Sequence, residues 1–159
     1  MDIARGGAAH RSACLAIARE LSDYFDARGL AQMAHDLDVH DLLVARRDDA
    51  VLGFLTLARK STSVAEISWM GVRPALQRQG IGAQLMSRAT SDLVSENVAL
   101  LEVKTLSARA EYAPYAATRR FYRRQGFVEL EVIDPYPGWG AGNPCAIYVR
   151  ALAATTGDG

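Results

Sequence analysis

The spacing of apolar side chains along this chain predicts strands interrupted by helices. Alternating or continuous apolar runs predict strands at residues 1–5, 41–46, 51–58, 64–72, 99–106, 127–133 and 145–152. Apolar residues three or four positions apart predict helices at residues 8–21, 30–37, 81–96 and 115–125, with Gly29 separating the first two. This order of elements predicts an α+β, or mixed α/β, fold with a central sheet.

The segments between these elements carry residues typical of turns. Asp48-Asp49 is expected to turn a hairpin, Ser61-Thr62-Ser63 the next turn, and the Pro- and Gly-rich residues 134–144 a stiff loop. Residues 153–159 are expected to form a disordered tail. Residues 1–152 are therefore expected to form a single domain.

Composition narrows the classes of function. The chain has 159 residues, and its 18 Lys and Arg balance 18 Asp and Glu, so nothing global indicates a nucleic-acid or membrane partner. No apolar run reaches the length of a membrane span, and no signal peptide is recognised. Cys14 and Cys145 are expected to be free thiols in a reducing cytoplasm. No spacing of His, Cys and Asp suggests a metal site, so no metal is expected.

A glycine-rich turn joins the strand at 64–72 to the helix at 81–96. It contains Gln-x-x-Gly-x-Gly, formed by Gln77, Gly80 and Gly82. Glycines at a helix start leave backbone N–H groups free, and the helix dipole adds positive potential there, so the turn could bind a pyrophosphate. The spacing differs from the dinucleotide fingerprint and from the P-loop. The alternative is a turn that only ends the strand.

A second motif, Phe121-Tyr122-Arg123-Arg124-Gln125-Gly126-Phe127, closes a helix and opens a strand. The two motifs, in this order and at this distance, resemble the GNAT superfamily of acyl-CoA-dependent N-acetyltransferases. The resemblance covers nearly the whole chain. It implies a GNAT-like single domain whose central sheet is mostly antiparallel, splayed and flanked by helices. It also implies acetyl-CoA as cosubstrate.

The resemblance implies which residues would bind the coenzyme. The N–H groups of Met70 and Val72 would hold the acetyl carbonyl and the pantetheine arm, and Gly71 fits a bulge or, alternatively, close packing against a helix. Arg78 would meet phosphate oxygens, unless it is only a solvated arginine at the helix start. The pyrophosphate would be held by Gln77, Arg78, Gln79, Gly80, Ile81 and Gly82.

Two residues are candidates for the chemistry. Glu66 is a charge in an otherwise apolar strand, at a place where several GNAT enzymes carry their general base. Strand alternation predicts that Glu66, Ser68 and Met70 share one face and that Ile67 and Trp69 lie on the other. The alternative for Glu66 is a solvent-facing or arginine-paired carboxylate. Tyr122 matches the tyrosine that protonates the leaving thiolate in many members, and its alternative is a core aromatic.

The chain departs from the family pattern near the second motif. Many members carry asparagine seven residues before the tyrosine, where it contacts pantetheine, but here that residue is Tyr115. Thr118 could compensate. Four arginines give the same helix a basic face that could meet the 3′-phosphate of coenzyme A or simply face solvent: Arg119, Arg120, Arg123 and Arg124.

The acceptor is the least determined part. Residues 20–45 carry six acidic side chains, and in this fold that segment usually roofs the acceptor site. These carboxylates, with nearby aromatic rings, could hold a cationic amine, or the helices could simply be acidic and solvated. The leading interpretation is therefore transfer of an acetyl group to a small-molecule or peptide amine. The alternatives are a non-catalytic acyl-CoA-binding or sensing module and, less favoured at zero net charge, a nucleic-acid binder. A homodimer is compatible with the sequence.

Overall fold

The computed structural model describes residues 1–153. The strands are β1 (Asp2–Arg5), β2 (Asp41–Arg47), β3 (Ala50–Arg59), β4 (Val64–Val72), β5 (Leu100–Leu106), β6 (Val128–Ile133) and β7 (Cys145–Ala151). The α-helices are α1 (Arg11–Glu20), α2 (Ala27–Val39), α3 (Ile81–Ser95) and α4 (Pro114–Arg124). Short 3-10 helices are η1 (Ala8–His10), η2 (Pro74–Leu76) and η3 (Ala108–Ala110). The predicted tail at 153–159 lies outside the described residues except for Ala153.

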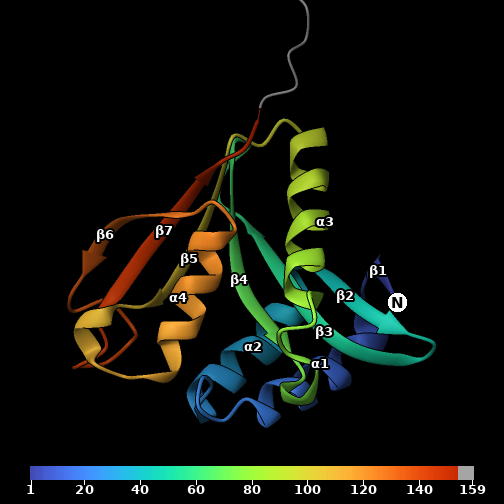
Figure 1. The fold of residues 1–159 in the computed structure, drawn as a ribbon, viewed down its shortest axis with the longest axis horizontal. Helices are drawn as coiled ribbons and strands as arrows, with labels where there is room; N and C mark the ends of the chain where they lie inside the picture. The colour runs from blue at the N-terminus through green and yellow to red at the C-terminus, as the bar shows by residue number, and fades with distance from the viewer. Residues whose placement is uncertain (154–159) are drawn as a thin grey trace, which may run out of the picture.

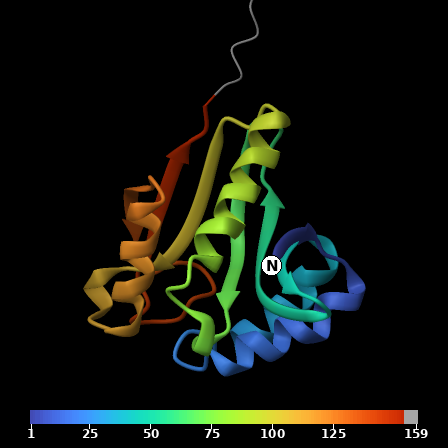
Figure 2. The ribbon, with the colours of Figure 1, turned by 45° about the vertical axis from the view of Figure 1, so that its right-hand side comes forward.

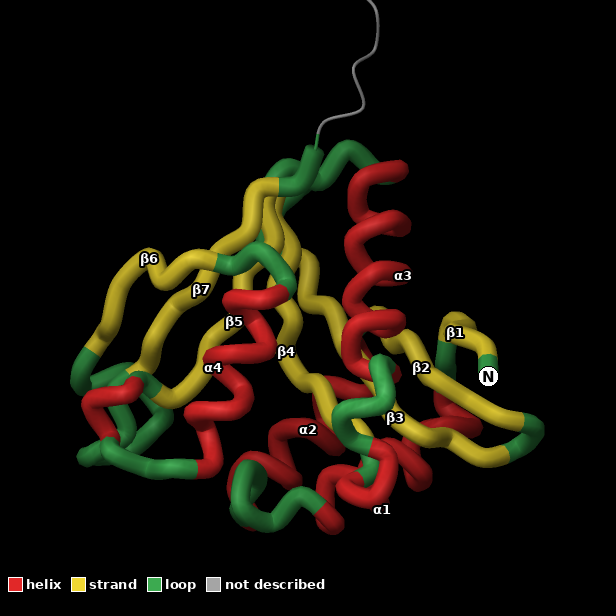
Figure 3. The backbone as a smooth tube through the Cα atoms, in the orientation of Figure 1, coloured by secondary structure: helices red, strands yellow, loops and turns green. Residues whose placement is uncertain are grey.

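The strands form one seven-stranded sheet in the order β1-β2-β3-β4-β5-β7-β6. Every pair is antiparallel except β4 and β5, which are parallel and pair only from Val64–Ile67 to Leu100–Val103. Beyond these residues the two strands diverge, as Figures 1 and 3 show. The predicted fold class, a mostly antiparallel and splayed sheet flanked by helices, is confirmed.

Helices cover both faces of the sheet and enclose two apolar cores. In both ribbon views α3 and α4 lie in front of the strands, while α1 and α2 pack together beneath them (Figures 1 and 2). Strand β2 shows the division, because Leu43 and Ala45 join the core under α3, whereas Leu42 and Val44 join the core under α1 and α2. This alternation is the period of two expected for a strand buried on both faces.

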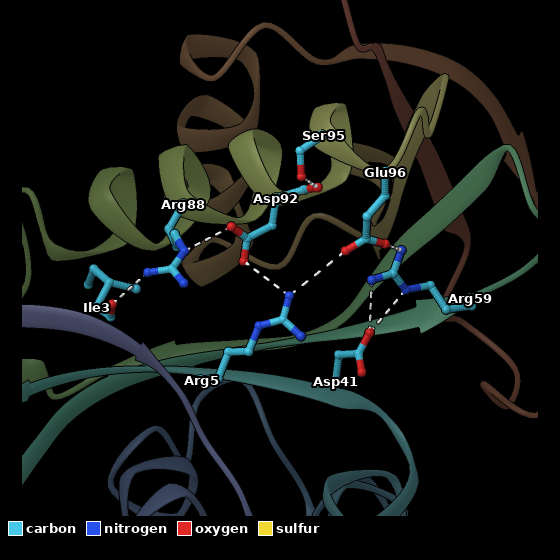
Figure 4. Close-up of polar contacts among 8 residues, drawn as sticks. All are labelled: Ile3, Arg5, Asp41, Arg59, Arg88, Asp92, Ser95 and Glu96. Atoms are coloured by element: carbon cyan, nitrogen blue, oxygen red, sulfur yellow. Dashed lines mark hydrogen bonds and ion pairs between the residues drawn. The ribbon is translucent and has the colours of Figure 1, made fainter.

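A charged network fastens α3 to the N-terminal strands (Figure 4). Arg59 bridges Asp41 at 2.9 Å and Glu96 at 2.6 Å, and Arg88 binds Asp92 at 2.9 Å while donating to the Ile3 carbonyl at 3.0 Å. Isolated surface pairs contribute little, but a network spanning strands and helix fixes the direction of α3. The N-terminus of that helix is where the glycine-rich turn lies.

Gly29 does not separate the first two helices, so this prediction was wrong. It lies in the first turn of α2, where its N–H donates to the Asp26 side chain at 2.8 Å. A capped first turn tolerates glycine because the cap, rather than helix propensity, satisfies the free N–H group.

The bulge in β4 is at Ser68 and not at Gly71. Trp69 pairs with Thr56 and Ile67 with Leu57, so Ser68 is the extra residue. A bulge reverses the alternation after it, and Met70 consequently packs with Ile67 in the core under α3. The predicted common face of Glu66, Ser68 and Met70 was therefore wrong.

Gly71 instead serves close packing, which was the alternative interpretation. A Cβ there would lie 3.1 Å from Leu21 Cδ1 and 3.1 Å from Phe54 Cε1. Both atoms belong to the core under α1 and α2. The absence of a side chain at Gly71 thus lets α1 approach β4.

Candidate coenzyme and acceptor site

The glycine-rich turn presents a continuous run of backbone donors. Arg78 and Gly80 adopt left-handed φ angles of 60° and 83°, and Gly80 caps α3, which begins at Ile81. Within the described residues, the amides from Arg78 to Ala83 donate to no backbone or side-chain acceptor. Free amides at the positive end of a helix form an anion-binding site.

The two glycines of the motif have different roles. A Cβ at Gly80 would meet nothing within 4 Å, so this position faces open space. A Cβ at Gly82 would lie 3.2 Å from Met70 Cε and 3.3 Å from Phe121 Cε2. Gly82 therefore lets α3 approach β4 and α4 closely, while Gly80 supplies the left-handed turn.

Two of the three polar side chains predicted to bind the coenzyme at this turn already form hydrogen bonds within the protein. Gln77 donates to the Val72 carbonyl at 3.3 Å, and Gln79 donates to the Ala75 carbonyl at 3.4 Å. Arg78 is exposed and makes no hydrogen bond or ion pair with the described residues. Its guanidinium is thus free to bind an anion at the turn.

The backbone of β4 leads from this turn along an unpaired edge. The Arg73 N–H donates to the Leu52 carbonyl of β3 at 3.0 Å. Because the N–H direction alternates along a strand, the Met70 and Val72 N–H groups point away from β3, to the side where β5 has diverged. These are the two amides that the sequence indicated.

Tyr122 lies in α4 beside that edge, in the core under α3, and the residue is only 6% exposed. It packs edge-on against Phe121 and Phe127 at 5.4 and 5.5 Å. Its hydroxyl makes no hydrogen bond with the described residues. Burial raises the pKa of Tyr122 above its usual value, so the phenol keeps its proton. The Tyr122 hydroxyl therefore offers a donor that no described residue uses and that a ligand could bind.

A buried hydroxyl without a partner among the described residues lies on β5. Thr105 alternates with Leu101 and Val103, which face the core under α3 and α4, and its Oγ1 has no hydrogen-bond partner in the described structure. Thr105 lies two residues beyond Val103, the last residue of β5 that pairs with β4. Sequence analysis did not single out Thr105, because only its burial distinguishes it from any other strand threonine.

The basic face of α4 divides into structural and free arginines. Arg119 is buried and donates to the Leu106 carbonyl at 2.9 Å, and Arg123 donates to the Tyr148 hydroxyl at 3.1 Å. Arg120 and Arg124 are exposed, with no hydrogen bond or ion pair to described residues. Thr118 lies one turn before Tyr122 and is half-buried. Only Arg120 and Arg124 are therefore free for a phosphate.

Tyr115 holds the loop between α1 and α2 against the start of α4. Its hydroxyl donates to the Tyr24 carbonyl at 2.8 Å, and the Tyr24 hydroxyl donates to the Pro114 carbonyl at 3.2 Å. Tyr112 adds a bond to the Asp23 carbonyl at 2.8 Å. We call these three bonds the tyrosine clasp. Burial raises the pKa of Tyr115 to about 12, so it remains a donor.

Glu66 lies on the sheet face opposite α3 and α4, in contact with two lysines. Its carboxylate lies 2.7 Å from Lys104 Nζ and 3.3 Å from Lys60 Nζ, and Lys60 also pairs with Glu102 at 2.8 Å. Burial lowers the pKa of Lys104, but the hydrogen bond and charge of Glu66 outweigh this, so the net shift is upward. The Tyr136 ring, from the loop before β7, lies 5.6 Å from Lys104 Nζ.

Most of the six carboxylates in residues 20–45 form hydrogen bonds or ion pairs within the protein. Asp36 accepts from the Trp69 indole at 2.7 Å and from Gln32 at 2.9 Å. The others with partners are Glu20 with Arg73, Asp26 with the Gly29 amide, Asp38 with Arg11 and Asp41 with Arg59. Among the six, only the Asp23 side chain has no partner in the described structure. A cationic acceptor cannot rely on a set of free carboxylates here.

A hydroxyl chain crosses the same face at the bulge. The Ser68 Oγ lies 2.9 Å from His40 Nδ1 and 2.7 Å from Thr56 Oγ1. His40 ends α2 and is half-buried. These hydrogen bonds could not be predicted from the sequence, because their residues come from β3, β4 and the end of α2. The bulge that turns Ser68 toward His40 and Thr56 was also placed at the wrong residue.

Sequence comparison identifies one family. The family described as acetyltransferase (GNAT) domain matches residues 38–129. No curated protein matches the sequence. Within the described residues, the helices are too short or too polar to cross a membrane, and no group of three or more His, Cys, Asp or Glu could hold a metal ion.

Solved structures share the fold over nearly the full length. A Desulfovibrio desulfuricans protein assigned to the GNAT acetyltransferases superposes with a TM-score of 0.84, at 21% identity over 96% of this chain and 99% of that one. The Escherichia coli ribosomal-protein-S18-alanine N-acetyltransferase superposes with a TM-score of 0.79, at 18% identity over 99% of this chain and 97% of that one. An Elizabethkingia anophelis GNAT acetyltransferase with acetyl-CoA bound gives 0.68, at 17% identity over 95% and 97%.

Proposed function

The chain belongs to the GNAT acetyltransferase family, and from this premise we propose that it moves the acetyl group of acetyl-CoA to a primary amine of a small molecule or peptide. Members of this family are acyl-CoA-dependent N-acyltransferases. The observation that carries the proposal is the run of free amides from Arg78 to Ala83, which continues into the unpaired edge of β4. Acetyl-CoA supplies an activated thioester, and the chain supplies binding and proton transfer.

Each part of the coenzyme has a complementary part of the site. The amides from Arg78 to Ala83 and the Arg78 side chain would hold the pyrophosphate, supported by Gln77 and Gln79, which brace the turn. The Met70 and Val72 N–H groups would hold the acetyl carbonyl and the pantetheine arm. Thr118 would replace the contact that asparagine makes in other members, because Tyr115 holds the loop instead.

Tyr122 would deliver the proton that the departing thiolate needs. Its hydroxyl is a donor without a partner among the described residues, and burial of the residue raises its pKa, so the phenol stays protonated at neutral pH. The residue that takes the proton from the amine is a separate question. The role of Glu66 as the base remains a prediction. Its carboxylate forms ion pairs with Lys104 and Lys60, which makes it a weaker proton acceptor.

A panel of amines tests the function. Purified protein is incubated with acetyl-CoA and with alkylamines, aminoglycosides and peptides that have a free N-terminus, and both released thiol and acetylated product are measured. The proposal expects thiol and N-acetyl product in equal amounts for at least one amine. Tight coenzyme binding without acetyl transfer to any amine would instead support the acyl-CoA-binding or sensing alternative.

Replacing Glu66 with glutamine is expected to reduce stability more than activity. The variant leaves the Lys104 ammonium, which is 18% exposed, without its nearest carboxylate, so the free energy of unfolding should fall by roughly 1–3 kcal/mol. Chemical denaturation measures this loss. The dependence of kcat/KM on pH should keep the wild-type shape. A flattened alkaline rise in that profile would show that Glu66 is the base.

Replacing Tyr115 with phenylalanine is expected to loosen the tyrosine clasp. The partly buried Tyr24 carbonyl loses its donor, which should cost about 1 kcal/mol of stability and raise the KM of the acceptor a few-fold, with coenzyme affinity unchanged. Tyr112→Phe is the matched control, because Tyr112 is 42% exposed and water can replace its bond. If Tyr115→Phe weakens coenzyme binding instead, Tyr115 contacts the coenzyme as the family asparagine does.

A further inference from the structure

The proton that leaves the acceptor amine needs a base on the open face of β4. An amine attacks as the neutral species, whereas most alkylamines are ammonium ions at neutral pH. Glu66 is held by two lysines, and five of the six carboxylates in residues 20–45 have structural partners. The carboxylates near β4 are therefore poorly suited to take a proton.

The hydrogen-bonded side chains of Thr56, Ser68 and His40 at the bulge are better placed to take this proton. Ser68 is the first residue of β4 beyond the pairing with β5, so it lies where the two strands begin to diverge. Its side chain is half-buried and lies on the face of Thr56, away from α3 and α4. A substrate that approaches the Met70 amide from this face passes Ser68.

One assignment of donors in this Thr56–Ser68–His40 hydrogen-bond network lets Ser68 accept a further proton. The Thr56 hydroxyl can donate to Ser68 Oγ at 2.7 Å, while its other acceptor, the Trp69 carbonyl, lies at 3.5 Å. Ser68 then donates to His40 Nδ1 at 2.9 Å, which requires a neutral imidazole with its proton on Nε2. This arrangement leaves a lone pair of Ser68 Oγ for an N–H of the incoming ammonium.

We propose that Ser68 and His40 form the relay that deprotonates the acceptor ammonium, an assignment that rests on the proposed acetyltransferase function. The ammonium gives one proton to Ser68 Oγ as Ser68 gives its own proton to His40 Nδ1. The products are a neutral amine and an imidazolium, which loses one proton to solvent and returns, through proton exchange with water, to the neutral ring with its proton on Nε2. Ser68 contacts the amine, and His40 acts through it.

The charges around His40 permit this cycle. Asp41 and Arg59 line a cavity of about 240 Å³ with His40, and they neutralise each other at 2.9 Å. The Asp36 side chain accepts from Trp69, and Glu66 is paired with lysines. No described carboxylate forms an ion pair with His40 that would hold its proton after transfer. Imidazole is also the side chain whose charge changes most readily near neutral pH.

The first test needs no turnover. Nitrogen-15 NMR of histidine-labelled protein, with His10, His35 and His40 assigned by single substitutions, reports the tautomer of each neutral ring. The relay requires His40 to carry its proton on Nε2, and Ser68→Ala should shift the Nδ1 resonance. A proton on Nδ1 would make His40 a donor to Ser68 and would overturn the proposal.

The second test compares two amines. His40→Asn keeps a hydrogen-bond acceptor near the position of Nδ1 but cannot take a proton. It should lower kcat/KM about tenfold for an alkylamine, since water recovers part of the base effect, and leave an alkoxyamine, neutral at pH 7, almost unchanged. Ser68→Ala should show the same pattern of kcat/KM as His40→Asn for the two amines. His35→Asn, on the exposed side of α2, should match the wild type for both.

A merely structural role gives a different pattern. Equal losses for both amines, or no loss for either, would overturn the relay. The wild-type protein separates this result from a failure of the proposed function, because absence of any acetylated amine with the wild type refutes the function, while the tautomer of His40 still decides the relay geometry.

Discussion

Replacing Gly80 with aspartate is expected to weaken acetyl-CoA binding about 100-fold, through like-charge repulsion at a site that binds an anion. A side chain at Gly80 meets no atom within 4 Å, and the left-handed φ of 83° is one that Asp and Asn tolerate better than other residues. The carboxylate would lie at the N-terminus of α3, among the free amides from Arg78 to Ala83. There it would repel the pyrophosphate and take the place of the anion.

Gly80→Asn is the matched control for this substitution. Asparagine has the same shape and the same backbone strain but no charge, so it should bind the coenzyme much more tightly than the aspartate variant. Calorimetry at low and high ionic strength measures both, and the gap between them should narrow with salt. If the two variants bind coenzyme A equally, the pyrophosphate does not lie at this turn.

More of the local geometry of the proposed coenzyme site than of the proposed acceptor site could be predicted from the sequence. The turn from Gln77 to Gly82 is local, and its glycines and helix start follow from adjacent residues. Tyr122 follows similarly from the end of one helix. Local motifs of this kind are visible in sequence because the residues that form the site are neighbours along the chain.

The acceptor side depends on contacts between distant segments. The bulge at Ser68 arises from pairing with β3, and one misplaced residue reversed the predicted faces of β4. The bond from Tyr115 to Tyr24 joins residues 91 positions apart. The partners of Glu66 are Lys60, in the turn before β4, and Lys104, on β5. Its ion pairs therefore could not be predicted from the sequence of β4 alone.

Replacing Tyr122 with phenylalanine is expected to lower kcat about 100-fold and leave the affinity for acetyl-CoA nearly unchanged. The hydroxyl makes no hydrogen bond in the described structure, so its removal leaves no buried group without a partner, and stability should not fall. Its contribution arises when the thiolate departs and needs a proton. An interaction made only at that stage appears in kcat rather than in ground-state binding.

The pH dependence provides an independent check on Tyr122. Because burial raises the pKa of this phenol, the acid form persists through the neutral and mildly alkaline range, and wild-type kcat should show no alkaline decline there. Tyr148→Phe is the control, since it removes a core phenol that bonds Arg123 rather than facing the site. Rapid-mixing measurements of a single turnover would isolate the chemical step from product release. If that step is equally fast in Tyr122→Phe and in wild type, the thiolate takes its proton from water or from the amine, and Tyr122 is a core aromatic.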